Sequence, residues 1–301
     1  MEELTKILAA CDLSDWARWL FTSTDPDARE TQLFLNRAFM HLPPSTQQRE
    51  TRQLGNADSS NTDAFLHELL VYEVCYEFGL DPDFKPIIDG KTPDLKLKIA
   101  GKTYLAEVFR TNRPKKTVIE FNGHPGYRDR GEGAKKIADR LSEKAATYRG
   151  LNHALILFVV FAGRTVNTRD LETALYGATV NELSSAGGLN IDCHEEWHRH
   201  GVFCPPGPTA RHREISAAIG CDWFDTLARN TPERRLHCVV YHHWQPHVAV
   251  ALGSFGRFQD VCWVGDESGL FIPQISGEPK LVMSTTGNEP KWGSYSADHP
   301  W

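Results

Sequence analysis

Three short pieces of sequence decide the fold: FLHELLV at 65–71, PDLKLKI at 93–99 and YLAEVF at 104–109. The first is typical of a packed helix, and the other two have the composition of β-strands. Each piece carries one acid in an apolar frame, namely Glu68, Asp94 and Glu107. Burying a carboxylate costs on the order of several kcal/mol unless a partner compensates it. Carboxylates that converge on one point are what a divalent cation needs, so the three acids are candidate metal ligands.

The two strand-like pieces predict a hairpin. Strands Asp94–Ile99 and Thr103–Phe109 would be joined by Ala100-Gly101-Lys102, a short turn containing glycine. Before them, Asp63 is expected to cap the helix that carries Glu68, and this helix should end near Gly79. Acids crowded at one site repel each other, so at least one of them should have a raised pKa when no cation is bound.

This order of helix, hairpin and acids resembles the PD-(D/E)XK nuclease superfamily, the restriction-endonuclease-like proteins, whose core runs helix, strand, strand, helix, strand. The match covers residues 60–165. It implies that Glu68 is the helical acid, Pro93-Asp94 the PD dipeptide and Glu107 the second strand acid. It further implies that Asp94 and Glu107, with Glu68, hold Mg²⁺ or Mn²⁺ and that the protein cleaves phosphodiester bonds in nucleic acid, with DNA as the expected substrate.

The sequence departs from this family at Phe109, where the family has a lysine two residues after the acid. Either another element supplies the lysine or the site is inactive. The helix expected at Gly133–Tyr148 carries three lysines, at 135, 136 and 144, and positions 136, 140 and 144 share one helical face. We assign the catalytic role to Lys144 and rank Lys136 second.

Charge is unevenly distributed along the chain. The net charge is −6, yet residues 110–149 contain eleven Lys or Arg and only five Asp or Glu. A basic strip beside a metal site is what a phosphodiester backbone would need, although solvated loops and helix faces produce similar blocks. The residues expected to contact nucleic acid are Arg110, Arg113, Lys115, Lys116, Lys136 and Arg140.

Composition indicates an ordinary globular protein. The 301 residues are 41% hydrophobic, and no apolar run reaches the length of a membrane span. Seven scattered cysteines and an N-terminus without a secretory pattern predict reduced thiols and a cytoplasmic protein that does not associate with membranes. The oligomeric state is left open, a homodimer included.

The expected fold class is α/β, a restriction-endonuclease-like mixed sheet flanked by helices. We expect an N-terminal helical extension at 1–45, a polar linker at 46–62, a nuclease-like domain with a C-terminal elaboration at 63–275, and an irregular tail at 276–301. The pattern predicts a helix at Asp170–Tyr176 and strands at Asp83–Ile88, Ala154–Phe161, Ile215–Ile219, Leu236–Tyr241 and Val248–Leu252.

Two alternatives remain open. One is an inactive nuclease-like module that binds nucleic acid or another partner, marked by Phe109. The other follows from HEEWH at 194–198, which matches the HExxH zinc motif: on a helix, His194 and His198 would bind Zn²⁺ with Glu195 as general base, giving a metallopeptidase. A structural metal bound by Cys193, His194, His198 or Cys204 is a variant of this reading.

Overall fold

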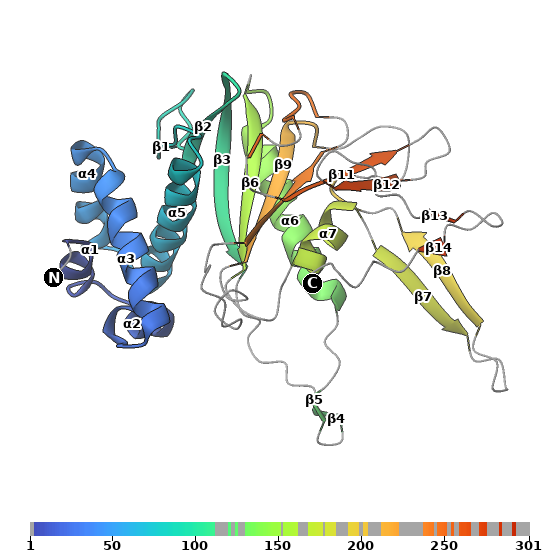
Figure 1. Ribbon diagram of the computed structural model, residues 1–301, viewed down its shortest axis with the longest axis horizontal. Coiled ribbons are helices and arrows are strands. Elements are labelled where there is room, and N and C mark those ends of the chain that lie inside the picture. The colour runs from blue at the N-terminus through green and yellow to red at the C-terminus, as the bar shows by residue number, and fades with distance from the viewer. Residues whose placement is uncertain are drawn as a thin grey trace.

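The computed structural model has a mixed α/β architecture in which a sheet separates two helical layers (Figure 1). It describes residues 3–111, 120–121, 124–125, 130–151, 153–161, 168–176, 178–184, 192–198, 201–203, 212–222, 237–243, 246–251, 254–255, 259–265, 271–275, 283–284 and 291–292. The expected α/β class is therefore confirmed.

Among the described residues, the main sheet has eight strands in the order β1-β2-β3-β6-β9-β10-β11-β12. The strands are β1 (Asp83–Phe84), β2 (Leu95–Ile99), β3 (Lys102–Thr111), β6 (Ala154–Phe161), β9 (Ile215–Asp222), β10 (His237–His242), β11 (Gln259–Gly265) and β12 (Phe271–Ile275). The β1–β2 and β2–β3 pairs are antiparallel, whereas β6 runs parallel to both β3 and β9. Helix α6 connects β3 to β6, as a parallel pair requires.

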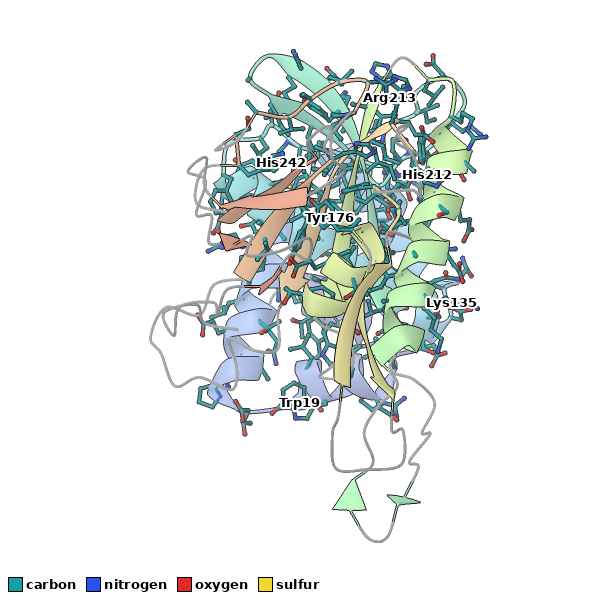
Figure 2. The ribbon with its side chains drawn as sticks, turned by 90° about the vertical axis from the view of Figure 1, so that its right-hand side faces the viewer. Trp19, Lys135, Tyr176, His212, Arg213 and His242 are labelled. Atoms are coloured by element: carbon teal, nitrogen blue, oxygen red, sulfur yellow. The ribbon has the colours of Figure 1, made fainter. Side chains whose placement is uncertain are left out.

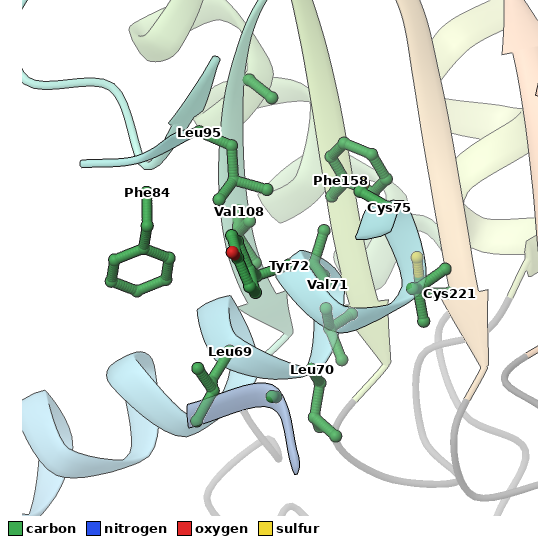
Figure 3. Packing of buried hydrophobic residues seen from close by; sticks show 14 of the residues in the cluster. Leu69, Leu70, Val71, Tyr72, Cys75, Phe84, Leu95, Val108, Phe158 and Cys221 are labelled. Atoms are coloured by element: carbon green, nitrogen blue, oxygen red, sulfur yellow. The ribbon is translucent and has the colours of Figure 1, made fainter. Parts of the chain in front are cut away.

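One face of the sheet is covered by the N-terminal helices, which are α1 (Glu3–Leu8), α2 (Asp15–Thr22), α3 (Pro26–His41), α4 (Pro44–Leu54) and α5 (Ser59–Glu77). Helix α5 lies against the sheet: Leu70, Val71 and Cys75 share a core with Val108 and Phe158 of the strands (Figure 3). Burial on this scale, about 25 cal/mol per Å² of apolar surface, is the main stabilisation of the layer.

The opposite face is covered by α6 (Arg130–Tyr148) and α7 (Thr168–Tyr176), which form a second core with the alternate strand residues (Figure 2). Strand β6 contributes to both cores, and all eight of its residues are buried. The continuous apolar run of β6 is the pattern of a strand covered on both faces, so this prediction is confirmed to the residue.

In the described part of the chain, three further two-stranded pairs lie outside the main sheet. They pair β4 (Glu120–Phe121) with β5 (His124–Pro125), β7 (Ala178–Ser184) with β8 (Asp192–His198), and β13 (Met283–Ser284) with β14 (Lys291–Trp292). The last pair lies in the tail that was expected to be irregular.

Several expectations about element limits are wrong. The expected linker at 46–62 contains most of α4 and the first turn of α5, because a polar helix with few buried side chains reads as a linker in the sequence. Asp58, not Asp63, caps α5, and its carboxylate accepts from the backbone N–H of Asn61 at 2.8 Å. The expected strand at Asp83–Ile88 is only the two residues of β1. Residues 248–251 of the last expected strand are not in a strand.

The hairpin is confirmed, with a tighter turn than expected. Ile99 pairs with Lys102, so the turn consists of Ala100 and Gly101 alone. Both have positive φ, +48° and +78°. This is the turn geometry whose twist matches that of two antiparallel strands. Among the described residues, no helix is both long enough and apolar enough to span a membrane.

Candidate functional site

Asp94 and Glu107 are direct neighbours across the hairpin. Leu95 pairs with Ala106, which places Asp94, just before β2, opposite Glu107 in β3. The odd-numbered residues of β2 pack toward α5, whereas Glu107 faces the other side of the sheet, where it contacts α6. The backbone N–H of Val108 donates to Asp94 Oδ2 at 2.7 Å, which fixes the Asp94 carboxylate beside β3.

Helix α6 provides two partners for Glu107. Lys144 Nζ forms an ion pair with Glu107 Oε2, and the Tyr148 hydroxyl donates to Glu107 Oε1. Lys144 and Tyr148 are one helical turn apart and therefore share a face. Glu107 itself is 3% exposed, so these partners compensate a carboxylate that water hardly reaches. The structure thus brings the expected lysine to the expected acid from a different element.

Phe109, at the position where a lysine was expected, is buried in the core against α6. Its side chain fills space between the sheet and the helix instead of supplying a charge.

Glu68 lies in the middle of α5 and is also buried. Its Oε2 atom is 2.8 Å from Lys85 Nζ, and the same ammonium is 3.3 Å from Glu50 Oε2 of α4. Despite the short ion-pair distance, Glu68 Oε2 receives no well-directed hydrogen bond from the described residues. This atom is a buried acceptor with residual capacity for a ligand.

The acids influence each other electrostatically. Burial raises the pKa of Asp94 well above its ordinary value, and the charges of Glu68 and Glu107 raise it further, against the opposing effects of the Val108 N–H and Lys144. Burial likewise raises the pKa of Glu68, which Lys85 opposes and Glu50 and Glu107 reinforce. The expected raised pKa is therefore found for two of the three acids. A cation bound among these buried acids would favour their ionised forms.

Sequence reasoning missed Lys85, Glu50 and Tyr148. Burial on its own would lower the pKa of Lys85, but its interactions with Glu68 and Glu50 prevail and raise it. Burial and the hydrogen bond to Glu107 raise the pKa of Tyr148. The spacing of four from Lys144 is a signal that could have found Tyr148. Glu50 lies in what reads as a polar linker, and no sequence signal connects it to the site.

The six basic residues expected to contact nucleic acid are only partly described. Arg113, Lys115 and Lys116 lie outside the described residues. Arg110 forms an ion pair with buried Asp63 of α5 and so ties β3 to that helix. The other two, Lys136 and Arg140, are exposed on α6. In the same helix Lys135 lies on the outer side, away from the sheet (Figure 2), and Arg140 pairs with Glu143 at 2.5 Å.

The zinc motif does not lie on a helix. Residues 192–198 form strand β8, with His194 opposite Glu182 and His198 opposite Ala178. Four residues of strand separate two Cα atoms by about 13 Å, roughly twice their distance on a helix. The helix on which His194 and His198 would have shared a face is therefore wrong. Cys204 lies outside the described residues.

Within the described part of the chain, no group of three or more His, Cys, Asp or Glu side chains is arranged to hold a metal ion as it stands. Two of the three candidate acids are paired with lysines: Glu68 with Lys85, and Glu107 with Lys144. The donors nevertheless suit a hard divalent cation: all are carboxylate oxygens, Glu68 Oε2 has residual capacity, and Asp94 is held in an environment that disfavours its charge.

Comparison of the chain with protein-family models, with curated proteins and with solved structures gives no match. The resemblance to the nuclease superfamily therefore rests on the motif residues and on the local geometry alone.

Proposed function

We propose that this protein is a divalent-metal-dependent phosphodiesterase that cleaves DNA with Mg²⁺ or Mn²⁺. The observation that carries the proposal is the contact of Lys144 with Glu107, beside Asp94 at the start of the neighbouring strand β2. Apart from the two-residue strands β1, β4 and β5, helix α5, strands β2 and β3, helix α6 and strand β6 come in the order helix, strand, strand, helix, strand. This is the order of the superfamily core that the motif resembles, with the lysine moved to the helix.

The residues have distinct roles in this proposal. Asp94 and Glu107, with Glu68, would hold the cation, which when bound lowers the pKa of a water and stabilises charge on the phosphate. Lys144 forms an ion pair with Glu107 and orients its carboxylate, and its ammonium would also reach the non-bridging phosphate oxygens or the attacking water. Tyr148 fixes the second oxygen of Glu107. Exposed Lys136 and Arg140 would contact the phosphate backbone farther along α6.

A second candidate is a nuclease-like module without cleavage activity. Two observations favour it: Phe109 occupies the usual lysine position as a core residue, and both oxygens of Glu107 already have partners within the protein. Such a module would bind nucleic acid through its basic residues and would not require a divalent cation.

DNA cleavage separates the two candidates. With Mg²⁺ or Mn²⁺ the enzyme should cleave plasmid DNA, EDTA should stop the reaction, and Glu107→Ala should abolish it. Binding of DNA with no cleavage in either metal would reject the enzyme and leave the inactive module.

A further inference from the structure

The backbone of Lys85 is tied to the backbone of Asp94. Lys85 follows β1 directly, and its N–H donates to the Asp94 carbonyl oxygen at 2.8 Å. Lys85, Asp94 and Glu107 therefore lie in a row across three neighbouring segments of the sheet. Lys85 has a φ of +48°, which is uncommon for a residue with a long side chain. Such strain persists only where surrounding contacts determine the conformation.

The side chain of Lys85 is held from several directions. Its ammonium contacts Glu68 at 2.8 Å and Glu50 at 3.3 Å, and it lies 5.8 Å from the Phe65 ring centre and 5.4 Å from that of Phe84. Only 22% of the side chain is exposed.

Glu50 is itself fixed. Its Oε1 accepts from Arg49 Nε at 2.8 Å, and it is 1% exposed. The resulting chain of charges runs from α4 through Lys85 to Glu68.

We propose that Lys85 is a positioning residue that competes with the divalent cation for Glu68, and that Glu50 keeps it in that position. The inference rests on the proposed function, because it assigns Glu68 to the metal site. It makes α4, which lies outside the helix–strand core of the resemblance, part of the site. The ammonium keeps Glu68 compensated until a cation replaces it.

Charge determines the direction of the effect. The Lys85 ammonium, 2.8 Å from Glu68 Oε2, occupies the position of a cation at that oxygen and already neutralises the carboxylate charge that would attract one. Removing it leaves the carboxylate uncompensated in a poorly hydrated setting, where charge interactions are strong. Cation affinity should then rise, whereas loss of a merely structural residue would lower it.

The test is Mn²⁺ binding to the full chain, measured from the electron paramagnetic resonance signal of free Mn²⁺. Lys85→Met should lower the Kd at least about tenfold, and Lys85→Gln, which keeps a donor, should shift it in the same direction. Lys85→Arg should bind as the wild type does. Lys98→Met is the matched control, since Lys98 pairs with Asp81 at 2.6 Å at the same sheet edge and is 57% exposed. Its Kd should not change.

A double variant shows whether the competition acts through Glu68. In a Glu68→Gln background, Lys85→Met should give no gain in Mn²⁺ affinity. A gain that persists there, or an unchanged Kd in Lys85→Met and Lys85→Gln while the wild type binds Mn²⁺, would overturn the inference and leave the proposed function standing. Absence of Mn²⁺ binding in the wild type and in every Lys85 variant would overturn the proposed function itself.

Discussion

Glu107 is the residue around which the candidate site is built. It is buried in strand β3 and lies opposite Asp94. Two residues of α6 contact it: the Lys144 ammonium and the Tyr148 hydroxyl. Removing either partner of this buried acid should destabilise the folded protein, because the carboxylate would lose part of the compensation for its burial. Asp94 differs: its carboxylate accepts a hydrogen bond from a backbone N–H, and its ionisation is disfavoured by burial and by two neighbouring acids.

Asp94→Asn should therefore stabilise the metal-free protein. The folded-state pKa of Asp94 is raised, so the folded state binds more protons than the unfolded state between the ordinary and the raised pKa. Stability from this group is present at low pH and is lost as pH rises through the folded-state pKa. Asparagine keeps an oxygen that accepts from the Val108 N–H. Because it does not ionise, it avoids the loss of folding stability at high pH, which is worth about 1.4 kcal/mol per unit of pKa difference.

Thermal unfolding in EDTA across pH measures this effect. The variant should melt several degrees higher than wild type at neutral pH, with a flatter pH dependence. In Mn²⁺ the order should reverse, because only the wild type gains stability from the cation. An Asp94→Asn protein that melts lower than wild type in EDTA would contradict the electrostatic argument.

Lys144 and Lys136 should behave differently when replaced. Lys144 contacts Glu107, whereas Lys136 is exposed on the same helix. Lys144→Met should lower the single-turnover cleavage rate by at least about a hundredfold with little change in DNA affinity. Lys136→Met should weaken DNA binding and reduce its salt dependence, because a phosphate contact is lost. Full activity in the double variant would show that neither lysine replaces the one absent at 109.

At the scale of elements, the hairpin sets the distance between the two strand acids, and its turn sets the register. Ala100 has a positive φ, which L-residues other than Asn and Asp adopt at an energetic cost of about 1–2 kcal/mol. The register of all five pairs from Ile99–Lys102 to Leu95–Ala106 follows from this two-residue turn.

Ala100→Asn should stabilise the protein by about 0.5–1 kcal/mol, since asparagine before glycine suits this turn. Urea unfolding monitored by circular dichroism measures the change. Gly101→Val is the opposing variant and should destabilise, because Gly101 has a φ of +78°. A destabilised Ala100→Asn would mean that the turn has another geometry.

The β7–β8 hairpin distinguishes between the phosphodiesterase and the peptidase hypotheses. A strand holds His194 and His198 too far apart to share one ion. His194→Ala should leave DNA cleavage within about twofold of wild type and should not change zinc content measured by elemental analysis. Peptidase activity that needs Zn²⁺ and is lost in His194→Ala would show that the strand assignment misrepresents the active protein.

Elements with a strong period were predictable, and those defined by distant contacts were not. The apolar run of β6 and the helix carrying Lys144 follow from local sequence. Helix α4 could not be predicted, because only two of its eleven residues, Glu50 and Leu54, are buried, and Glu50 is a charged residue that pairs with distant Lys85. Within the site, the three acids were predictable from their apolar frames. Lys85 was not, because its partners lie 17 and 35 residues away.

At the scale of the whole molecule, the sheet divides the site's supporting residues between two cores. Glu68 comes from the α5 layer, and Lys144 and Tyr148 come from the α6 layer (Figure 1). Between them, Glu107 lies in β3, whose central residues are buried on both faces, and Asp94 is fixed beside it by the Val108 N–H. Under the proposed function, the basic block at 110–149 would be the part of this chain of net charge −6 that meets a polyanion.

The most direct test of this account is the single-turnover rate of plasmid cleavage in Mg²⁺ and in Mn²⁺, for wild type, Glu107→Gln, Asp94→Asn and Lys98→Met purified identically. The account predicts a rate that EDTA abolishes, that falls at least about a thousandfold in the two acid variants, and that is unchanged in Lys98→Met. Equal rates in all four proteins, or no cleavage by the wild type in either metal, would contradict it.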